Sequence, residues 1–138
     1  SDKHPDHTAD FDHPTDRYIV KLGDRVIPET TNIVLLKEKS PHGRYPHIPY
    51  FPLSDVNTEL LTQTDHTTYC PLKGHASYYT LTADGQTLEN AVWYYPGPLE
   101  YVAPIANTVA FYPNHLTIIR ETNISAEIIT GYQAMRQS

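Results

Sequence analysis

The amino-acid sequence predicts a mainly β domain built from antiparallel strands, and three observations support this fold class. The dipeptides Gly23-Asp24, Asp84-Gly85 and Pro113-Asn114 each separate two short segments rich in β-branched and aromatic residues. Such dipeptides between such segments are typical of β-hairpins. The chain has 12 prolines among 138 residues, which fits short strands and turns better than long helices. A chain of this length is expected to form one hydrophobic core.

Residues 1–16 are expected to form a flexible tail. They include five acids and one lysine, and so carry −4 of the total formal charge of −6. Phe11 is their one large apolar residue, so this segment buries too little surface to offset the entropy lost on ordering. An alternative is a metal-binding arm formed by its aspartates and histidines. The rest of the chain is nearly neutral and has no cluster of Lys or Arg, which argues against a nucleic-acid partner.

The first half of the domain is predicted to contain strands, a loop and one short helix. Residues 17–22 and 25–28 form a hairpin around Gly23-Asp24, and the mostly apolar residues 32–37 form a third strand. Residues 39–47 include two prolines and a glycine and are expected to be a loop. Tyr50-Phe51-Pro52 suits an edge strand or the end of a strand. Ser54 and Asp55 are candidate caps for a helix over residues 56–61.

The second half is predicted to contain two hairpins and two helices. Residues 77–81 and 87–93 form the hairpin around Asp84-Gly85, and residues 109–112 and 116–120 form the one around Pro113-Asn114. Apolar spacings of three and four predict a short helix over residues 99–106, which Pro104 must begin or end.

A C-terminal helix is predicted over residues 125–135. Ser125 is its candidate cap, and its apolar stripe consists of Ile128, Ile129, Tyr132 and Met135. This stripe would pack on the domain or on a second copy of the chain in a homodimer. The expected organisation is therefore a tail over residues 1–16, one antiparallel β domain over residues 17–122, and a helical C-terminus over residues 123–138.

Residues 64–79 hold the highest density of chemically active side chains. This segment contains the sole cysteine, Cys70, with two histidines, an acid, a lysine and several hydroxyl groups. Such a polar segment is costly to bury without mutual hydrogen bonds, so we expect its side chains to converge on one pocket. The expected members are Asp65, His66, Thr68, Cys70, Lys73 and Tyr78, with an aromatic wall from Tyr50 or Trp93.

The same segment resembles the signature of the domain of unknown function 427 family. The matching residues are Thr64-Asp65-His66-Thr67-Thr68-Tyr69-Cys70-Pro71, Lys73-Gly74, Ala76 and Tyr78. Further matches follow the same order along the chain at Tyr50-Phe51-Pro52, Asp55-Val56, Asn90-Ala91-Val92-Trp93-Tyr94 and Phe111-Tyr112-Pro113. The resemblance implies a β-tent fold, a small folded-sheet domain similar to methionine sulfoxide reductase B. It implies no established reaction.

Two activities associated with such relatives find no support in the sequence. A nucleotidyltransferase label accompanies some family members, but the chain has neither a phosphate-binding glycine loop nor paired carboxylates for magnesium. A sulfoxide reductase would need a resolving cysteine or an external thiol, and Cys70 is alone.

Each member of the dense segment has a functional and a structural interpretation. Cys70 is a nucleophile if Lys73 or His66 lies close enough to favour its thiolate, and otherwise a small buried residue. Asp65 and His66 suit general base catalysis, but neighbours on a strand point in opposite directions, so a local turn would be required. Otherwise Asp65 caps the loop and His66 bonds the backbone. Lys73-Gly74 suits an anionic ligand group, or a turn with a solvated lysine.

The candidate ligand-binding residues are Arg44, Tyr50, Thr68, Tyr78 and Trp93. Arg44 lies in the predicted loop, where it would be an anion clamp over the site or an ordinary exposed arginine. Trp93 and the two tyrosines after it are either a ligand platform or part of the sheet packing.

No metal and no cofactor is expected. A mixed site from His66, Cys70 and His75 fits by spacing, but a zinc site of four thiolates is ruled out by a single cysteine. A lone cysteine also favours a reducing compartment, so the cytoplasm is the default location. No apolar run approaches the roughly 20 residues that span a bilayer, and the polar N-terminus does not resemble a signal peptide. Neither membrane insertion nor secretion is expected.

Two classes of function follow. The first is a binding module whose polar pocket, built on residues 65–74, takes a small polar or anionic ligand. The alternative is an enzyme that uses Cys70 as a nucleophile or His66 as a general base, with Lys73 stabilising the negative charge that develops. Binding is favoured, because no third residue that would complete a Cys-His relay can be identified in the sequence.

Overall fold

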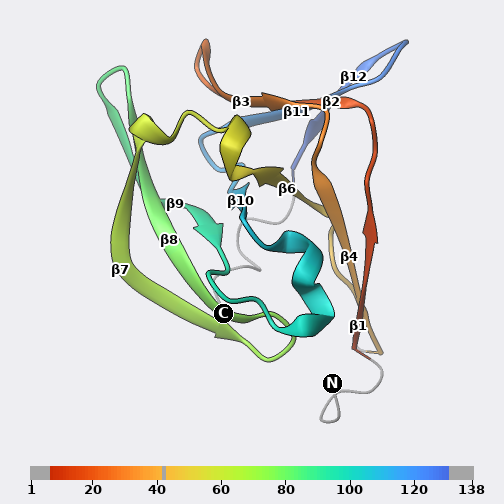
Figure 1. The fold of residues 1–138 in the computed structure, drawn as a ribbon. Helices are drawn as coiled ribbons and strands as arrows, with labels where there is room; N and C mark the ends of the chain where they lie inside the picture. The colour runs from red at the N-terminus through yellow and green to blue at the C-terminus, as the bar shows by residue number, and fades with distance from the viewer. Residues whose placement is uncertain (1–6, 42, 131–138) are drawn as a thin grey trace.

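The computed structural model describes residues 7–41 and 43–130, which form two antiparallel β-sheets (Figure 1). The larger sheet contains β1 (Thr8–Asp12), β4 (Val34–Ser40), β5 (Gly43–Arg44), β6 (Ile48–Pro52), β7 (Leu61–Cys70), β8 (Gly74–Ala83), β9 (Gln86–Tyr94) and β10 (Thr108–Phe111). The smaller sheet contains β2 (Arg17–Leu22), β3 (Arg25–Thr30), β11 (Thr117–Glu121) and β12 (Ala126–Ile129). The predicted mainly β, antiparallel fold class is confirmed.

The strand orders show how the chain passes between the sheets. The larger sheet has the order β1-β4-β6-β10-β9-β8-β7, with β5 paired to β4, and the smaller sheet has the order β12-β11-β2-β3. Figure 1 shows β7 and β8 curving along one side of the molecule, with β1 and β4 on the opposite side. Within the described part of the chain, no helix is both long and apolar enough to cross a membrane.

Two of the three predicted hairpins are confirmed. β2 pairs with β3 across a turn in which Gly23 has a φ of +59°, and β8 pairs with β9 across Asp84-Gly85. Asp84 and Gly85 have φ angles of +52° and +79°, as expected for the turn type that matches the twist of two-residue hairpins.

The third predicted hairpin, around Pro113-Asn114, is wrong. β10 pairs with β6 and β9 in the larger sheet, whereas β11 pairs with β2 and β12 in the smaller sheet. Pro113-Asn114 therefore belongs to a connection that carries the chain from one sheet to the other. A turn dipeptide reports that the chain changes direction, but not which strand pairs with which.

The predicted C-terminal helix is also wrong where the structure describes it. Residues 126–129 form β12, which pairs with β11 after a tight turn closed by the Thr122 amide donating to the Ser125 carbonyl at 2.8 Å. The neighbours Ile128 and Ile129 differ in burial, since Ile128 is exposed and Ile129 packs against the core. Isoleucine favours strands once a partner is available. The remainder of the predicted helix lies outside the described residues.

Short helices occur near two of the predicted places, as 3-10 turns. η1 (Leu53–Asp55) and η2 (Thr58–Leu60) replace the predicted single helix, and neither has a side-chain cap. Asp55 instead accepts a hydrogen bond from the Thr30 hydroxyl at 2.7 Å. η3 (Glu100–Ile105) lies where a helix was predicted, with Pro104 inside it and a break in helical geometry at Val102.

The N-terminal segment differs from the flexible tail that we expected over residues 1–16. Residues 8–12 form β1, an edge strand that pairs with β4 over five residue positions. Phe11 of β1 packs against the hydrophobic core. Ion pairs from Asp10 to Lys39 and from Asp12 to Lys37 join the two strands.

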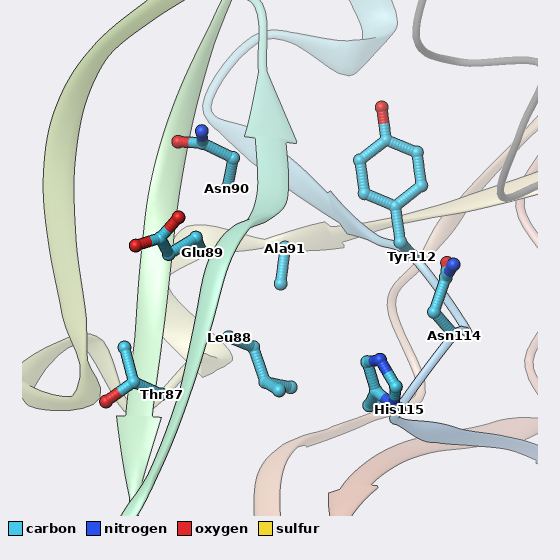
Figure 2. A pocket seen from close by; sticks show the side chains of 8 residues that line it. All are labelled: Thr87, Leu88, Glu89, Asn90, Ala91, Tyr112, Asn114 and His115. Atoms are coloured by element: carbon cyan, nitrogen blue, oxygen red, sulfur yellow. The ribbon is translucent and has the colours of Figure 1, made fainter.

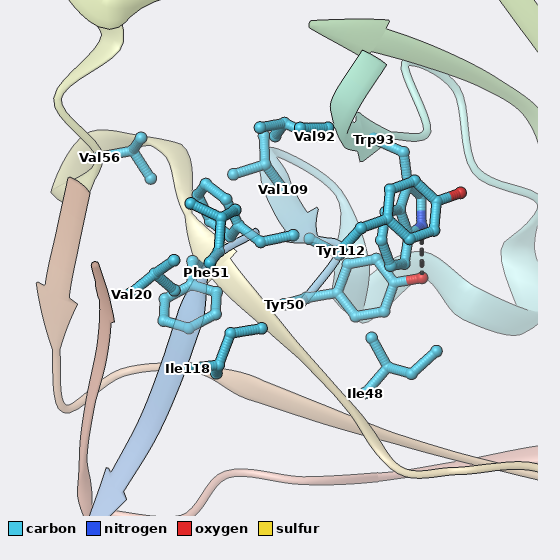
Figure 3. Packing of buried hydrophobic residues seen from close by; sticks show 14 of the residues in the cluster. Val20, Ile48, Tyr50, Phe51, Val56, Val92, Trp93, Val109, Tyr112 and Ile118 are labelled. Carbon is cyan, nitrogen blue, oxygen red and sulfur yellow. Dashed lines mark hydrogen bonds between the residues drawn. The ribbon is translucent and has the colours of Figure 1, made fainter. Parts of the chain in front are cut away.

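The core lies between the two sheets and continues through the larger one (Figure 3). Val20 and Ile118 of the smaller sheet face Phe51 of β6. Because neighbours on a strand point to opposite faces, Tyr50 lies on the other face of β6, where its hydroxyl accepts a hydrogen bond from Trp93 Nε1 at 3.2 Å. β6 is therefore an interior strand buried on both faces, and Pro52 is at its end.

Candidate functional site

The dense polar segment forms β7, a turn and the start of β8, and strand alternation divides its side chains into two sets. His66, Thr68 and Cys70 are half-buried on one face, whereas Asp65 and Tyr69 are exposed on the other. An acid–imidazole pair between Asp65 and His66 does not form, because β7 remains extended between them. The expected single pocket therefore does not include Asp65.

Tyr78 brings three of the expected site residues together. Its hydroxyl shares a hydrogen bond of 2.9 Å with Thr68 Oγ1, and its ring centroid lies 4.5 Å from that of His66. In the register of β8 and β9, Tyr78 lies opposite Trp93, which in turn bonds Tyr50. Trp93 and Tyr50, which we expected as an aromatic wall, are fully buried, so both rings contribute to the packing of the core.

Lys73 lies apart from this group in the turn between β7 and β8. Its amide donates to the Cys70 carbonyl at 3.1 Å, and its carbonyl accepts from the Leu99 amide at 3.1 Å. Gly74 follows with a φ of +106°, and an added Cβ would lie 3.6 Å from the Gly97 carbonyl oxygen and the Leu99 side chain. The tight turn and the segment before η3 therefore fix the backbone of Lys73.

The Lys73 side chain forms a buried ion pair that the sequence did not predict. Lys73 is 1% exposed and Glu38 of β4 is 5% exposed. Lys73 Nζ donates to Glu38 Oε1 at 2.8 Å, and the other carboxylate oxygen, Oε2, lies 2.6 Å from His7 Nε2. One carboxylate thus joins the β7–β8 turn to the residue just before β1.

Glu38 also lines a cleft of about 480 Å³ beside β5. Its lining residues are Glu38, Lys39, Ser40, Pro41, Gly43, Tyr45 and His47. The His7 ring stacks on Tyr45 with a centroid separation of 5.6 Å. We call this the β4–β5 cleft. Arg44, the expected anion clamp, lies in β5 with its backbone opposite Lys39.

The sequence contained no signal for Glu38, His7 or Tyr45 as site residues. Glu38 and Lys73 are separated by 35 positions, and only the folded sheet brings them together. Glu38 lies in a strand that alternates buried and exposed positions. A carboxylate at a buried position of such a strand indicates a buried ion pair, but the burial of that position can be inferred only once the strand register is known.

The mixed metal site from His66, Cys70 and His75 is not assembled. His75 is exposed and contacts Tyr69, with ring centroids 4.8 Å apart, on the opposite face of the sheet from His66 and Cys70. Among the described residues, no group of three or more His, Cys, Asp or Glu side chains is placed to hold a metal ion.

Comparison with known protein families identifies the chain. Residues 10–122 match the family model described as Domain of unknown function (DUF427). The chain belongs to the DUF427 family. This confirms the resemblance inferred from the motifs of β7 and β8, and the matched region begins within β1 instead of at residue 17. No curated protein matches the chain. Because the DUF427 description states no activity, a function must be argued from the geometry.

Proposed function

We propose that this domain binds a small anionic ligand in the β4–β5 cleft. The observation that carries the proposal is the buried ion pair between Lys73 and Glu38, with His7 on the second carboxylate oxygen, at the wall of this cleft. This proposal retains Lys73 from the predicted site and moves the pocket away from β7.

The energetics of the ion pair support a role beyond stability. Removing two charges from water costs several kcal/mol for each ion, and their mutual attraction offsets this cost only when the geometry is good. Apolar side chains of similar volume would give roughly the same stability. Stability alone therefore does not explain this buried ion pair, and we attribute it to ligand binding in the neighbouring cleft. The ion pair and His7 hold the Glu38 carboxylate in one orientation.

The charge of the cleft favours an anion over a cation. Lys73 offsets the charge of Glu38, so that the remaining charge in the lining comes from Lys39, with His47 as a further positive group when protonated. Lys39 lies 4.0 Å from Asp10, but both side chains are mostly exposed, and such pairs are weak.

The alternative, an enzyme with Cys70 as nucleophile or His66 as general base, has weaker support. Asp65 lies on the face opposite to His66, and the Lys73 ammonium group bonds Glu38. The His66 ring packs on Tyr78 and its amide donates to Thr64 Oγ1 at 3.3 Å, and neither partner is an acid that would orient an imidazole for proton abstraction.

The proposal can be tested by titration calorimetry with inorganic phosphate, acetate, succinate and citrate, and with acetamide as a neutral comparison. We expect saturable binding of at least one anion, weakening with added salt because exposed charges are screened. His47→Asn and Lys39→Met should each weaken this binding. The matched control is His115→Asn, since His115 is likewise exposed but lies in a different cleft.

Two results would contradict the proposal. One is the absence of saturable binding for every anion in the panel, with folded protein confirmed by thermal melting. The other is an equal loss of affinity in the His47→Asn and His115→Asn variants, which would place the anion elsewhere.

A further inference from the structure

A second cleft lies between β9 and the connection from β10 to β11 (Figure 2). Its volume is about 350 Å³, within the usual range of roughly 300–1,000 Å³ for small-molecule sites. Its lining residues are Thr87, Leu88, Glu89, Asn90, Ala91, Tyr112, Asn114 and His115. We call it the β9 cleft. It shares no residue with the β4–β5 cleft.

Asn90 is held in an uncommon backbone conformation at this cleft. Its φ is +52°, in the left-handed region that side chains rarely adopt, although asparagine does so more readily than most residues. Hydrogen bonds to two threonine hydroxyl groups hold Asn90 in this conformation. The Asn90 amide donates to Thr80 Oγ1 at 3.2 Å, and Thr64 Oγ1 donates to Asn90 Oδ1 at 2.7 Å. The β8–β9 pairing is irregular at this point.

These contacts fix which end of the Asn90 carboxamide is available. The oxygen is used by Thr64, whereas within the described part of the chain Nδ2 makes no hydrogen bond. In Figure 2 the Asn90 carboxamide projects from β9 to the side away from Tyr112, Asn114 and His115, so Asn90 shapes the backbone of β9 at the cleft.

The other walls combine apolar surface with uncharged polar groups. In Figure 2, Leu88 and Ala91 point across the gap toward the segment that carries Tyr112, Asn114 and His115, whereas Glu89 and Thr87 project to the other side of β9. The lining contains no lysine and no arginine, so it offers no permanent positive charge to a phosphate or carboxylate. Asn114 and His115 each present a donor and an acceptor.

This chemistry suits a ring that carries hydroxyl groups. Each hydroxyl donates one hydrogen bond and accepts others, which matches carboxamide and imidazole partners. The C–H face of such a ring packs on an apolar wall such as Leu88 and Ala91. We propose that the β9 cleft binds a neutral polyhydroxylated ring of the size of a monosaccharide or cyclitol.

The test is a two-dimensional amide NMR titration of the full chain with D-glucose, D-galactose, D-mannose and myo-inositol. Benzamide serves as a neutral planar comparison, and inorganic phosphate as an anion. We expect at least one sugar or the cyclitol to shift the amide signals of residues 87–91, 112 and 114–116, with saturation in the millimolar range. Asn114→Ala and His115→Ala should each weaken the affinity about fivefold, the effect of one neutral hydrogen bond.

The control is His75→Asn, because His75 is exposed on β8 and lines neither cleft. This variant should leave sugar binding unchanged.

Three results would overturn the proposal. These are shifts caused by benzamide alone, shifts that map outside the β9 cleft, and no saturable shift with any of the four polyhydroxylated probes. The polyhydroxylated probes test the β9 cleft alone and the carboxylate probes test the β4–β5 cleft alone, so failure of either proposal leaves the other intact.

Discussion

At the scale of single residues, Lys73 is predicted to matter most for stability. Lys73→Met leaves the buried Glu38 carboxylate without the ammonium group that bonds it, and breaking a buried ion pair costs about 3–5 kcal/mol. Urea denaturation should show this loss. Lys39→Met is the control, because Lys39 is exposed and such substitutions change stability by about 0.5 kcal/mol or less.

A double variant separates the charge effect from packing. Glu38→Gln/Lys73→Met removes both charges but keeps an amide that can bond His7, so it should recover most of the stability lost in Lys73→Met. If Lys73→Met unfolds at the same urea concentration as Lys39→Met, the ion pair is not buried in solution as described.

Asp84 provides a pH dependence that can be measured directly. The hydrogen bond from Arg25 is the main cause that lowers the pKa of Asp84, its partial burial opposes this, and the positive charge of Arg25 lowers it further. Because the folded pKa lies below the unfolded one, this contribution to stability is present above the ordinary carboxyl pKa and is lost as the pH falls through the folded value. Carbon NMR of the carboxyl group should show Asp84 titrating at higher pH in Arg25→Met.

A control for this titration is Lys21→Met, a change at another basic residue of the same small sheet. It should leave the Asp84 titration unchanged. An Asp84 curve that is the same with and without Arg25 would rule out the paired geometry, in which Arg25 Nη2 lies 2.6 Å from Asp84 Oδ1.

At the scale of elements, the status of β1 can be tested through Phe11. If Phe11 lay in a flexible tail, its replacement would not change the free energy of unfolding. In β1 its side chain packs against the core. Full burial of a phenylalanine contributes roughly 1.5–3 kcal/mol, so Phe11→Ala should cost about 1 kcal/mol for this half-buried position. Thr8→Ala, at an exposed position of β1, is the control. Equal urea midpoints for the two variants would argue for the tail.

Elements were predictable from the sequence where local chemistry decides them. Gly23 and the Asp84-Gly85 pair need positive φ angles, and the predicted hairpins formed there. β12 was mistaken for a helix because Ile128 and Ile129 fit a helical stripe as well as a strand, and pairing with β11 decided the outcome. β1 was missed because its apolar content is low and β4 supplies the partner.

The candidate site was predictable only within one segment. The contact of His66 and Thr68 with Tyr78 joins neighbouring strands of one hairpin, and the dense segment indicated these residues. The ion pair of Lys73 with Glu38 joins the β7–β8 turn to β4, which is distant from it in sequence. Its partner therefore depends on the order of strands in the sheet, which the motif does not encode.

At the scale of the whole molecule, the two sheets share one core and should unfold together. Val20 and Ile118 of the smaller sheet belong to the same buried cluster as Phe51, Val92 and Val109 of the larger one (Figure 3). Neither sheet can lose its partner without exposing this cluster to water. The connection from β10 to β11 crosses between the sheets and adds covalent continuity.

Trp93 makes this cooperativity measurable. It is the one tryptophan of the chain, is fully buried, and packs against Tyr50 and Tyr112 in the larger sheet. Far-ultraviolet circular dichroism follows the strands of both sheets. If the domain unfolds in one step, Trp93 fluorescence and circular dichroism should give coincident urea transitions. The free energy of unfolding should then fall with urea by about 1–3 kcal/mol/M.

Ile118→Ala should shift both curves to lower urea by the same amount. The variant removes a buried contact of the smaller sheet, and the shared core couples the loss of that contact to the unfolding around Trp93. Separate transitions, or a shift confined to circular dichroism, would show that the smaller sheet unfolds independently.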